Sequence, residues 1–121
     1  MPKSVAIGWF PAGQFEQAVA LWPDLVAGWR VSGFTEYCHA FDRHLRELEL
    51  LPDTSVLLAA IDVKHYLKWC AQAGLDSGSP ESRSRYAAEV ATRGRAQPWP
   101  PKTGKRCWCG RDEAYENCCG A

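Results

Sequence analysis

The sequence predicts a small α/β domain that is mainly helical, with a short two-stranded sheet and a cysteine-rich C-terminal tail. Two short apolar runs, Ser4–Phe10 and Thr54–Ile61, are typical of buried strands. Apolar residues at helical spacing fill most of the chain between and after these runs. Four of the six cysteines lie within the last fifteen residues. These three observations set the fold class.

The first half of the chain indicates a strand that leads into helices. Pro11 ends the first apolar run, and Phe15, Val19 and Trp22 then follow at helical spacing. From Ser32 the pattern predicts the clearest helix of the chain, with Asp42 and Arg46 toward solvent. The apolar stripe of this helix consists of Phe34, Tyr37, Cys38, Phe41, Leu45 and Leu48.

The second apolar run allows two interpretations. We expect a buried strand over 54–61, with Asp62 capping a helix from Val63 to Ala73 that Gly74 ends. The alternative is a single helix from Val56 to Ala73. In the first case the two strands lie parallel, with helices in the connection between them.

The last predicted helix gives way to a proline-rich segment. Ser79 is placed to cap this helix and Pro80 to occupy its first position. The three prolines of Gln97–Pro101 favour an extended polyproline conformation. The predicted organisation is therefore an α/β helical body at 1–96, a Pro-rich basic linker at 97–106 and a metal-binding tip at 107–121.

The tip carries a metal-binding pattern. Cys107 and Cys109 are separated by one residue, and the adjacent pair Cys118 and Cys119 follows after eight more. Two thiolates from a tight turn and two from a returning loop can complete the tetrahedral all-sulfur shell that zinc favours. Because four thiolates leave no position for an activated water, we expect one structural zinc ion. Disulfides are a weaker interpretation, since adjacent cysteines bridge poorly to each other.

These residues resemble the SEC-C motif, the zinc-binding tail of the bacterial translocase ATPase SecA. The resemblance covers about an eighth of the chain, and the matching positions are Cys107, Cys109, Gly110, Tyr115, Cys118, Cys119 and Gly120. It implies the zinc ligand set and a body of unassigned function, because the tail is also similar to the end of a loose group of bacterial proteins that finish in SEC-C. In the family the partners are an acidic chaperone and the ribosome. This chain departs from the family pattern by having acidic residues around Tyr115.

Charge is unevenly distributed although the formal net charge is zero. Residues 83–111 carry eight basic side chains against Glu89 alone, whereas residues 112–121 carry only acidic ones. We expect an adaptor that docks a protein partner, such as a chaperone, the ribosome or a larger assembly. The expected docking residues are Trp99, Trp108, Tyr115, Lys102, Lys105 and Arg106. The alternative is nucleic-acid binding, with segment 83–111 on the phosphates and Trp99 or Trp108 stacked on bases.

The sequence lacks several common catalytic motifs and shows no membrane-spanning segment or signal peptide. It has no phosphate-binding Gly-x-x-x-x-Gly-Lys-Ser/Thr motif, no Gly-x-Ser-x-Gly elbow and no His-Glu-x-x-His pair. No apolar run reaches the roughly 20 residues of a membrane helix, and residues 1–10 do not form a signal peptide. We therefore expect a non-enzymatic cytoplasmic protein. The oligomeric state is left open by the sequence.

Overall fold

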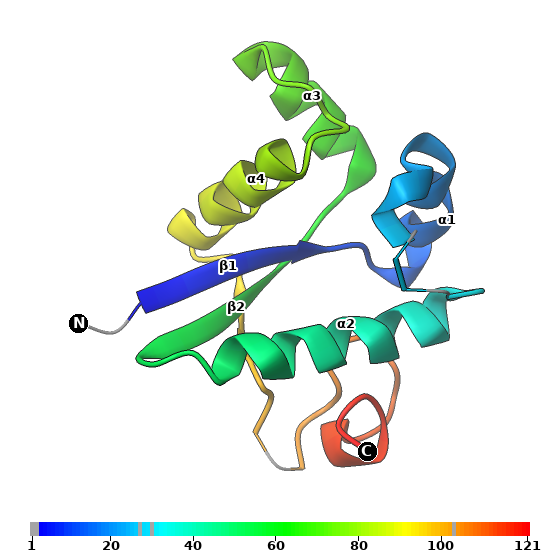
Figure 1. Cartoon of the computed structure of the whole chain (residues 1–121), viewed down its shortest axis with the longest axis vertical. Coiled ribbons are helices and arrows are strands. Elements are labelled where there is room, and N and C mark those ends of the chain that lie inside the picture. The colour runs from blue at the N-terminus through cyan, green and yellow to red at the C-terminus, as the bar shows by residue number, and fades with distance from the viewer. Residues whose placement is uncertain (1–2, 27, 30, 103) are drawn as a thin grey trace.

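Helices cover both faces of a central sheet in the computed structural model, which describes residues 3–26, 28–29, 31–102 and 104–121. In Figure 1, α3 and α4 lie above the sheet, α2 lies below it, and α1 lies at one end. The helices are α1 (Ala12–Leu21), α2 (Phe34–Glu49), α3 (Val63–Ala73) and α4 (Pro80–Thr92), with short 3-10 turns η1 (Pro23–Val26) and η2 (Tyr115–Asn117). The mainly helical α/β class is confirmed.

Among the described residues the sheet has three strands, whereas the sequence predicted two. β1 (Lys3–Trp9) pairs in parallel with β2 (Thr54–Ala60), and β3 (Gln97–Trp99) pairs with β2 in antiparallel orientation on its other side. The third strand occupies the start of the predicted linker. Proline is tolerated there because β3 is an edge strand, where a missing N–H removes few ladder hydrogen bonds. Residue 103 of the same segment lies outside the described residues.

Local sequence signals place the helices after β2 correctly. Thr54–Ala60 is a strand, so the alternative of one long helix is wrong. The Asp62 carboxylate accepts from the His65 backbone N–H at 3.0 Å and caps α3. Ser79 Oγ accepts from the Glu81 N–H at 3.2 Å and caps α4. Gly74 ends α3 in the left-handed conformation, as the sequence predicted.

Two clusters of buried side chains flank the sheet. One contains Phe10, Trp22 and Tyr66 and is shared by α1, α3 and the neighbouring helix α4. The other contains Trp9 of β1, Phe41 of α2 and Leu58 of β2. Within the described ranges, no helix combines the length and the apolar character needed to cross a membrane.

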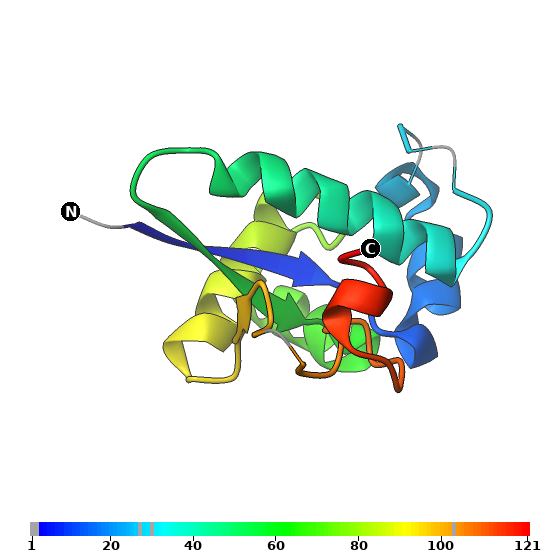
Figure 2. The same ribbon diagram turned by 90° about the horizontal axis from the view of Figure 1, so that it is seen from below.

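The cysteine-rich tail is part of the second cluster. Trp108 packs edge-on against Trp9, with ring centroids 4.9 Å apart, and contacts Phe41 at 5.7 Å. Figures 1 and 2 both place the C-terminal turn, drawn in red, against α2. The tail and the body therefore share one core. A segment this short cannot bury enough apolar surface by itself, so its aromatic residues complete the core of the body.

Candidate metal centre

Four buried cysteines converge in the tail. The Sγ atoms of Cys107, Cys109, Cys118 and Cys119 all lie within 4.8 Å of one another. Cys109 Sγ and Cys118 Sγ are 3.6 Å apart. All four residues are free cysteines and all are buried. The pairs that the sequence analysis identified as ligands are therefore brought together by the fold.

Backbone hydrogen bonds hold the two cysteine pairs at this distance. The Cys107 N–H donates to the Glu113 carbonyl at 2.8 Å, and the Tyr115 N–H donates to the Lys105 carbonyl at 3.0 Å. These bonds fold the chain back on itself between the pairs. Gly110 has φ +95°, a conformation that favours glycine, and it turns the chain directly after Cys109. The turn η2 directly precedes Cys118 and places its Sγ atom beside that of Cys109.

The arrangement fits a metal ion with four sulfur ligands. A tetrahedral ion with metal–sulfur bonds of about 2.3 Å separates its ligands by about 3.8 Å, close to the distances in this cluster. Four sulfur donors suit zinc and other ions that prefer thiolates over carboxylates. The four cysteines can therefore hold a metal ion, and they would fill its coordination shell.

The pKa values of three thiols in the cluster are shifted in different directions. Burial raises the pKa of Cys109 to about 12. The pKa of Cys119 is also raised, first by a hydrogen bond with Cys38 and then by burial. Burial opposes ionisation of Cys107, but hydrogen bonds with the backbone of Cys109 and Cys119 outweigh it and lower its pKa. A metal ion must therefore displace protons from at least two of these sites.

A buried carboxylate lies beside the cysteine cluster. Asp42 of α2 is 0% exposed, and its Oδ1 accepts from Trp99 Nε1 and Trp108 Nε1, both at 3.0 Å. The Tyr115 hydroxyl donates to the same carboxylate at 3.0 Å, and Arg46 Nε lies 2.9 Å from Oδ2. We name these five residues the Asp42 network. The expectation that Asp42 faces solvent is wrong, because three donors from distant parts of the chain cover it.

Two further contacts fasten the tail to α2. Arg46 Nη2 donates to the Cys119 carbonyl at 2.9 Å. Arg111, which follows the first cysteine pair, donates to the Thr35 hydroxyl. The sequence did not predict that Asp42, Arg46 or Thr35 contacts the tail. An acidic residue beside an apolar stripe was the only local sign, and it is equally typical of an exposed helix face.

Comparison with known protein families matches the middle of the chain but not the cysteine-rich tail. A family model described as a domain of unknown function, DUF8829, matches residues 26–102, which is more than half of the chain. The chain belongs to this family. Neither a curated protein nor a solved structure matches it. The DUF8829 match runs from η1 through β3, and it ends before the first cysteine of the tail.

The Asp42 network joins the DUF8829 segment to the tail. Asp42, Arg46 and Trp99 lie within the matched residues, whereas Trp108 and Tyr115 lie beyond them. The cysteine cluster is thus attached to the DUF8829 segment through side chains of both parts of the chain.

The structure separates the predicted docking residues into two groups. Trp99 and Trp108 are 6% and 3% exposed, so the expectation that they are presented at the surface is wrong. Both indole N–H groups donate hydrogen bonds to Asp42. Tyr115 is half-buried, and its hydroxyl donates to the same carboxylate. The three basic residues Lys102, Lys105 and Arg106 are exposed, and Arg106 pairs with Asp112 at 3.0 Å.

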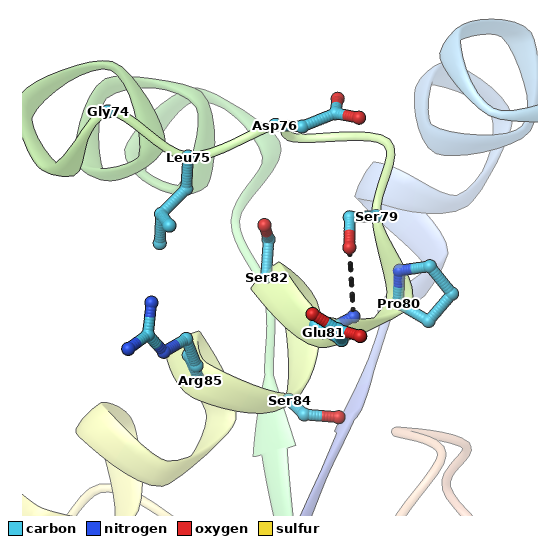
Figure 3. Close-up of a pocket in the computed structure, with 9 residues that line it drawn as sticks. All are labelled: Gly74, Leu75, Asp76, Ser79, Pro80, Glu81, Ser82, Ser84 and Arg85. Atoms are coloured by element: carbon cyan, nitrogen blue, oxygen red, sulfur yellow. Dashed lines mark hydrogen bonds between the residues drawn. The ribbon is translucent and has the colours of Figure 1, made fainter.

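A separate hollow of about 810 Å³ lies at the turn between α3 and α4 (Figure 3). Two of its polar side chains accept hydrogen bonds from nearby backbone N–H groups. Asp76 Oδ1 accepts from the Gly78 N–H at 2.9 Å, and Ser79 caps α4. Arg85 faces this hollow together with the acidic Asp76 and Glu81, so it carries mixed charge. Figure 1 shows α3 and α4, whose connecting turn lines the hollow, on the opposite side of the sheet from the C-terminal turn. The cysteine cluster is therefore the stronger candidate site.

Proposed function

We propose that this DUF8829 protein is a non-enzymatic adaptor whose C-terminal tail is ordered by one structural zinc ion and contributes to docking a protein partner. The convergence of four buried thiols is the observation that carries the proposal. An all-sulfur donor set is the one that structural zinc sites use. The resemblance of the tail to SEC-C supports the same metal.

A structural role for the metal follows from the donor set. Four cysteine ligands saturate a tetrahedral zinc ion and leave no position at which a water molecule could be activated. The free thiols also require a reducing environment, because zinc binds thiolates and not disulfides. We therefore propose a cytoplasmic protein.

The exposed basic residues of the segment before the cysteines are the docking surface that we propose. Lys102 and Lys105 are exposed, and no ion pair of either is among those of the described residues. Such side chains attract an acidic protein surface and raise the association rate. A chaperone, the ribosome or a larger assembly remain the partner classes that we propose.

Nucleic-acid binding through segment 83–111 is the second candidate, and its support is the exposed basic residues alone. Stacking on bases requires an accessible aromatic face. The burial of Trp99 and Trp108 removes the two platforms that this hypothesis used. We therefore favour the protein partner.

The test measures metal content and partner capture on the same purified chain. Native mass spectrometry should find one zinc ion per chain, and affinity capture should retain a protein that is lost in the double variant Lys102→Glu and Lys105→Glu. The matched control is Lys64→Glu with Lys68→Glu, two exposed lysines of α3. A chain without metal would contradict the zinc proposal. Capture of nucleic acid, with affinity falling steeply as salt rises, would favour the second candidate.

A further inference from the structure

The Asp42 network surrounds a fully buried carboxylate that requires hydrogen-bond donors. A buried carboxylate is strongly disfavoured unless hydrogen bonds and opposite charge replace its hydration. Asp42 meets this requirement with four donors, of which only Arg46 belongs to its own helix. The other three come from β3 and from the tail. Asp42 is therefore satisfied only when the tail is in place.

The two tail donors lie inside the cysteine motif itself. Trp108 is the residue between Cys107 and Cys109, and Tyr115 begins the turn that leads to Cys118. Each cysteine pair is therefore attached to the same carboxylate through a neighbouring aromatic side chain. Arg46 adds a third connection, since it bonds both Asp42 and the Cys119 carbonyl.

We propose that Asp42 is the positioning residue of the metal centre, through which metal binding in the tail and packing of the body stabilise each other. This inference rests on the proposed metal site. By holding Trp108 and Tyr115, Asp42 sets the distance between the two cysteine pairs before the metal arrives. Coupling of this kind is reciprocal. The free energy by which packing of the tail on the body strengthens metal binding equals the free energy by which bound metal stabilises that packing.

A purely structural Asp42 behaves differently from a positioning one. If its only role were to stabilise the fold, its replacement would lower the free energy of unfolding, while the folded protein would bind metal as before. A positioning residue alters the affinity of the folded protein and the geometry of the ligands. Metal affinity and the absorption spectrum of bound Co²⁺ are the readouts that separate the two.

The test compares Asp42→Asn with the unaltered 121-residue chain. The asparagine keeps the size of the side chain and removes its charge. We expect zinc affinity, measured by competition with a chromophoric chelator, to fall about 10- to 100-fold, the usual effect of losing a group that orients metal ligands. The absorption bands of bound Co²⁺ should shift or broaden because the four sulfur atoms are held less uniformly. Unchanged affinity and unchanged bands would overturn the proposal.

The control is Val63→Ala, which removes buried apolar atoms from the other core cluster. It should lower the free energy of unfolding but leave zinc affinity within about twofold, since Val63 lies in a different core cluster from Trp99 and Trp108 of the Asp42 network. A loss of affinity in this control equal to that of Asp42→Asn would also overturn the proposal. General destabilisation would then account for both results.

Two milder variants cover the case in which Asp42→Asn does not fold. Trp108→Phe and Tyr115→Phe each keep an aromatic ring and delete one donor to Asp42. Each should weaken zinc binding several-fold, and unchanged affinity in both would contradict the inference. An unaltered chain that binds no zinc would instead refute the proposed function. Failure to find a protein partner would leave the Asp42 measurements unaffected.

Discussion

Gly120 and Tyr115 illustrate why particular residues of the tail have little freedom to change. A Cβ atom at Gly120 would lie 2.6 Å from Cε2 of the Tyr115 ring. This ring cannot move freely, because its hydroxyl donates to Asp42 and the Gly120 N–H donates to its backbone carbonyl. Glycine at this position is thus a requirement of close packing.

We therefore predict that Gly120→Ala destabilises the protein. Forcing a methyl group into a packed site costs about 1–3 kcal/mol, and the midpoint of thermal unfolding should fall accordingly. Gly13→Ala is the matched control, since Gly13 lies within α1 and a methyl group there would meet nothing within 4 Å. That change should leave stability equal or raise it by about 0.5–1 kcal/mol. Equal stability of the two variants would contradict the packing argument.

The thiol pKa values predict how metal affinity depends on pH. The raised pKa values of Cys109 and Cys119 keep these thiols protonated at neutral pH when no metal is bound. Metal binding releases those protons, so zinc affinity should rise with pH, by about tenfold per pH unit for each proton released. Chelator competition at several pH values near neutrality measures the slope. An affinity that does not change with pH would show that the free thiols are already ionised.

At the scale of elements, α2 connects the sheet to the tail. Its apolar residues, such as Phe41, face the sheet, while Asp42 and Arg46 hold the tail. Figure 2 shows this helix running beside β1, with the C-terminal turn against it. One helix therefore determines where the cysteine cluster lies on the body.

The cap of α4 gives a prediction at the same scale. Ser79→Ala removes the hydroxyl that accepts from the Glu81 N–H, and loss of such a cap costs about 0.5–2 kcal/mol. Ser84→Ala is the control, because Ser84 is exposed within the same helix and alanine is the better helix former. Chemical denaturation should show a lower free energy of unfolding for the first variant alone. Comparable losses in both would assign the effect to something other than the cap.

At the scale of the whole molecule, the tail and the body share one core. Trp108 fills space between Trp9 and Phe41, so displacing the tail would expose apolar surface of β1 and α2. The cost of that exposure links the position of the tail to the stability of the entire domain.

We predict that the double variant Cys118→Ser and Cys119→Ser loses metal and also weakens the body. Tryptophan emission should shift to longer wavelength as Trp99 and Trp108 become hydrated, and amide hydrogens of β2 and α2 should exchange faster. Cys70→Ser, in the opposite cluster, is the control for substituting a buried thiol. It should retain the metal and the emission maximum. A double variant with unaltered exchange in the body would show that the tail is an independent module.

Much of the fold was predictable because its signals are local. The caps at Asp62 and Ser79 and the run that forms β2 each depend on neighbours within a few residues, and all three were predicted correctly. The strand β3 was not, because a short segment with a proline is recognised as a strand only when β2 lies beside it.

The candidate metal ligands could be found from the sequence alone, because two cysteine pairs separated by a short loop can meet without help from the rest of the chain. Their surroundings depend on tertiary packing. Asp42 receives hydrogen bonds from residues 57 to 73 positions away, and no periodicity or motif records contacts over such a separation. For the same reason the sequence could not show that Trp99 and Trp108 are buried. Both become buried when β3 and the tail pack against α2, where the Asp42 carboxylate accepts from their indole N–H groups.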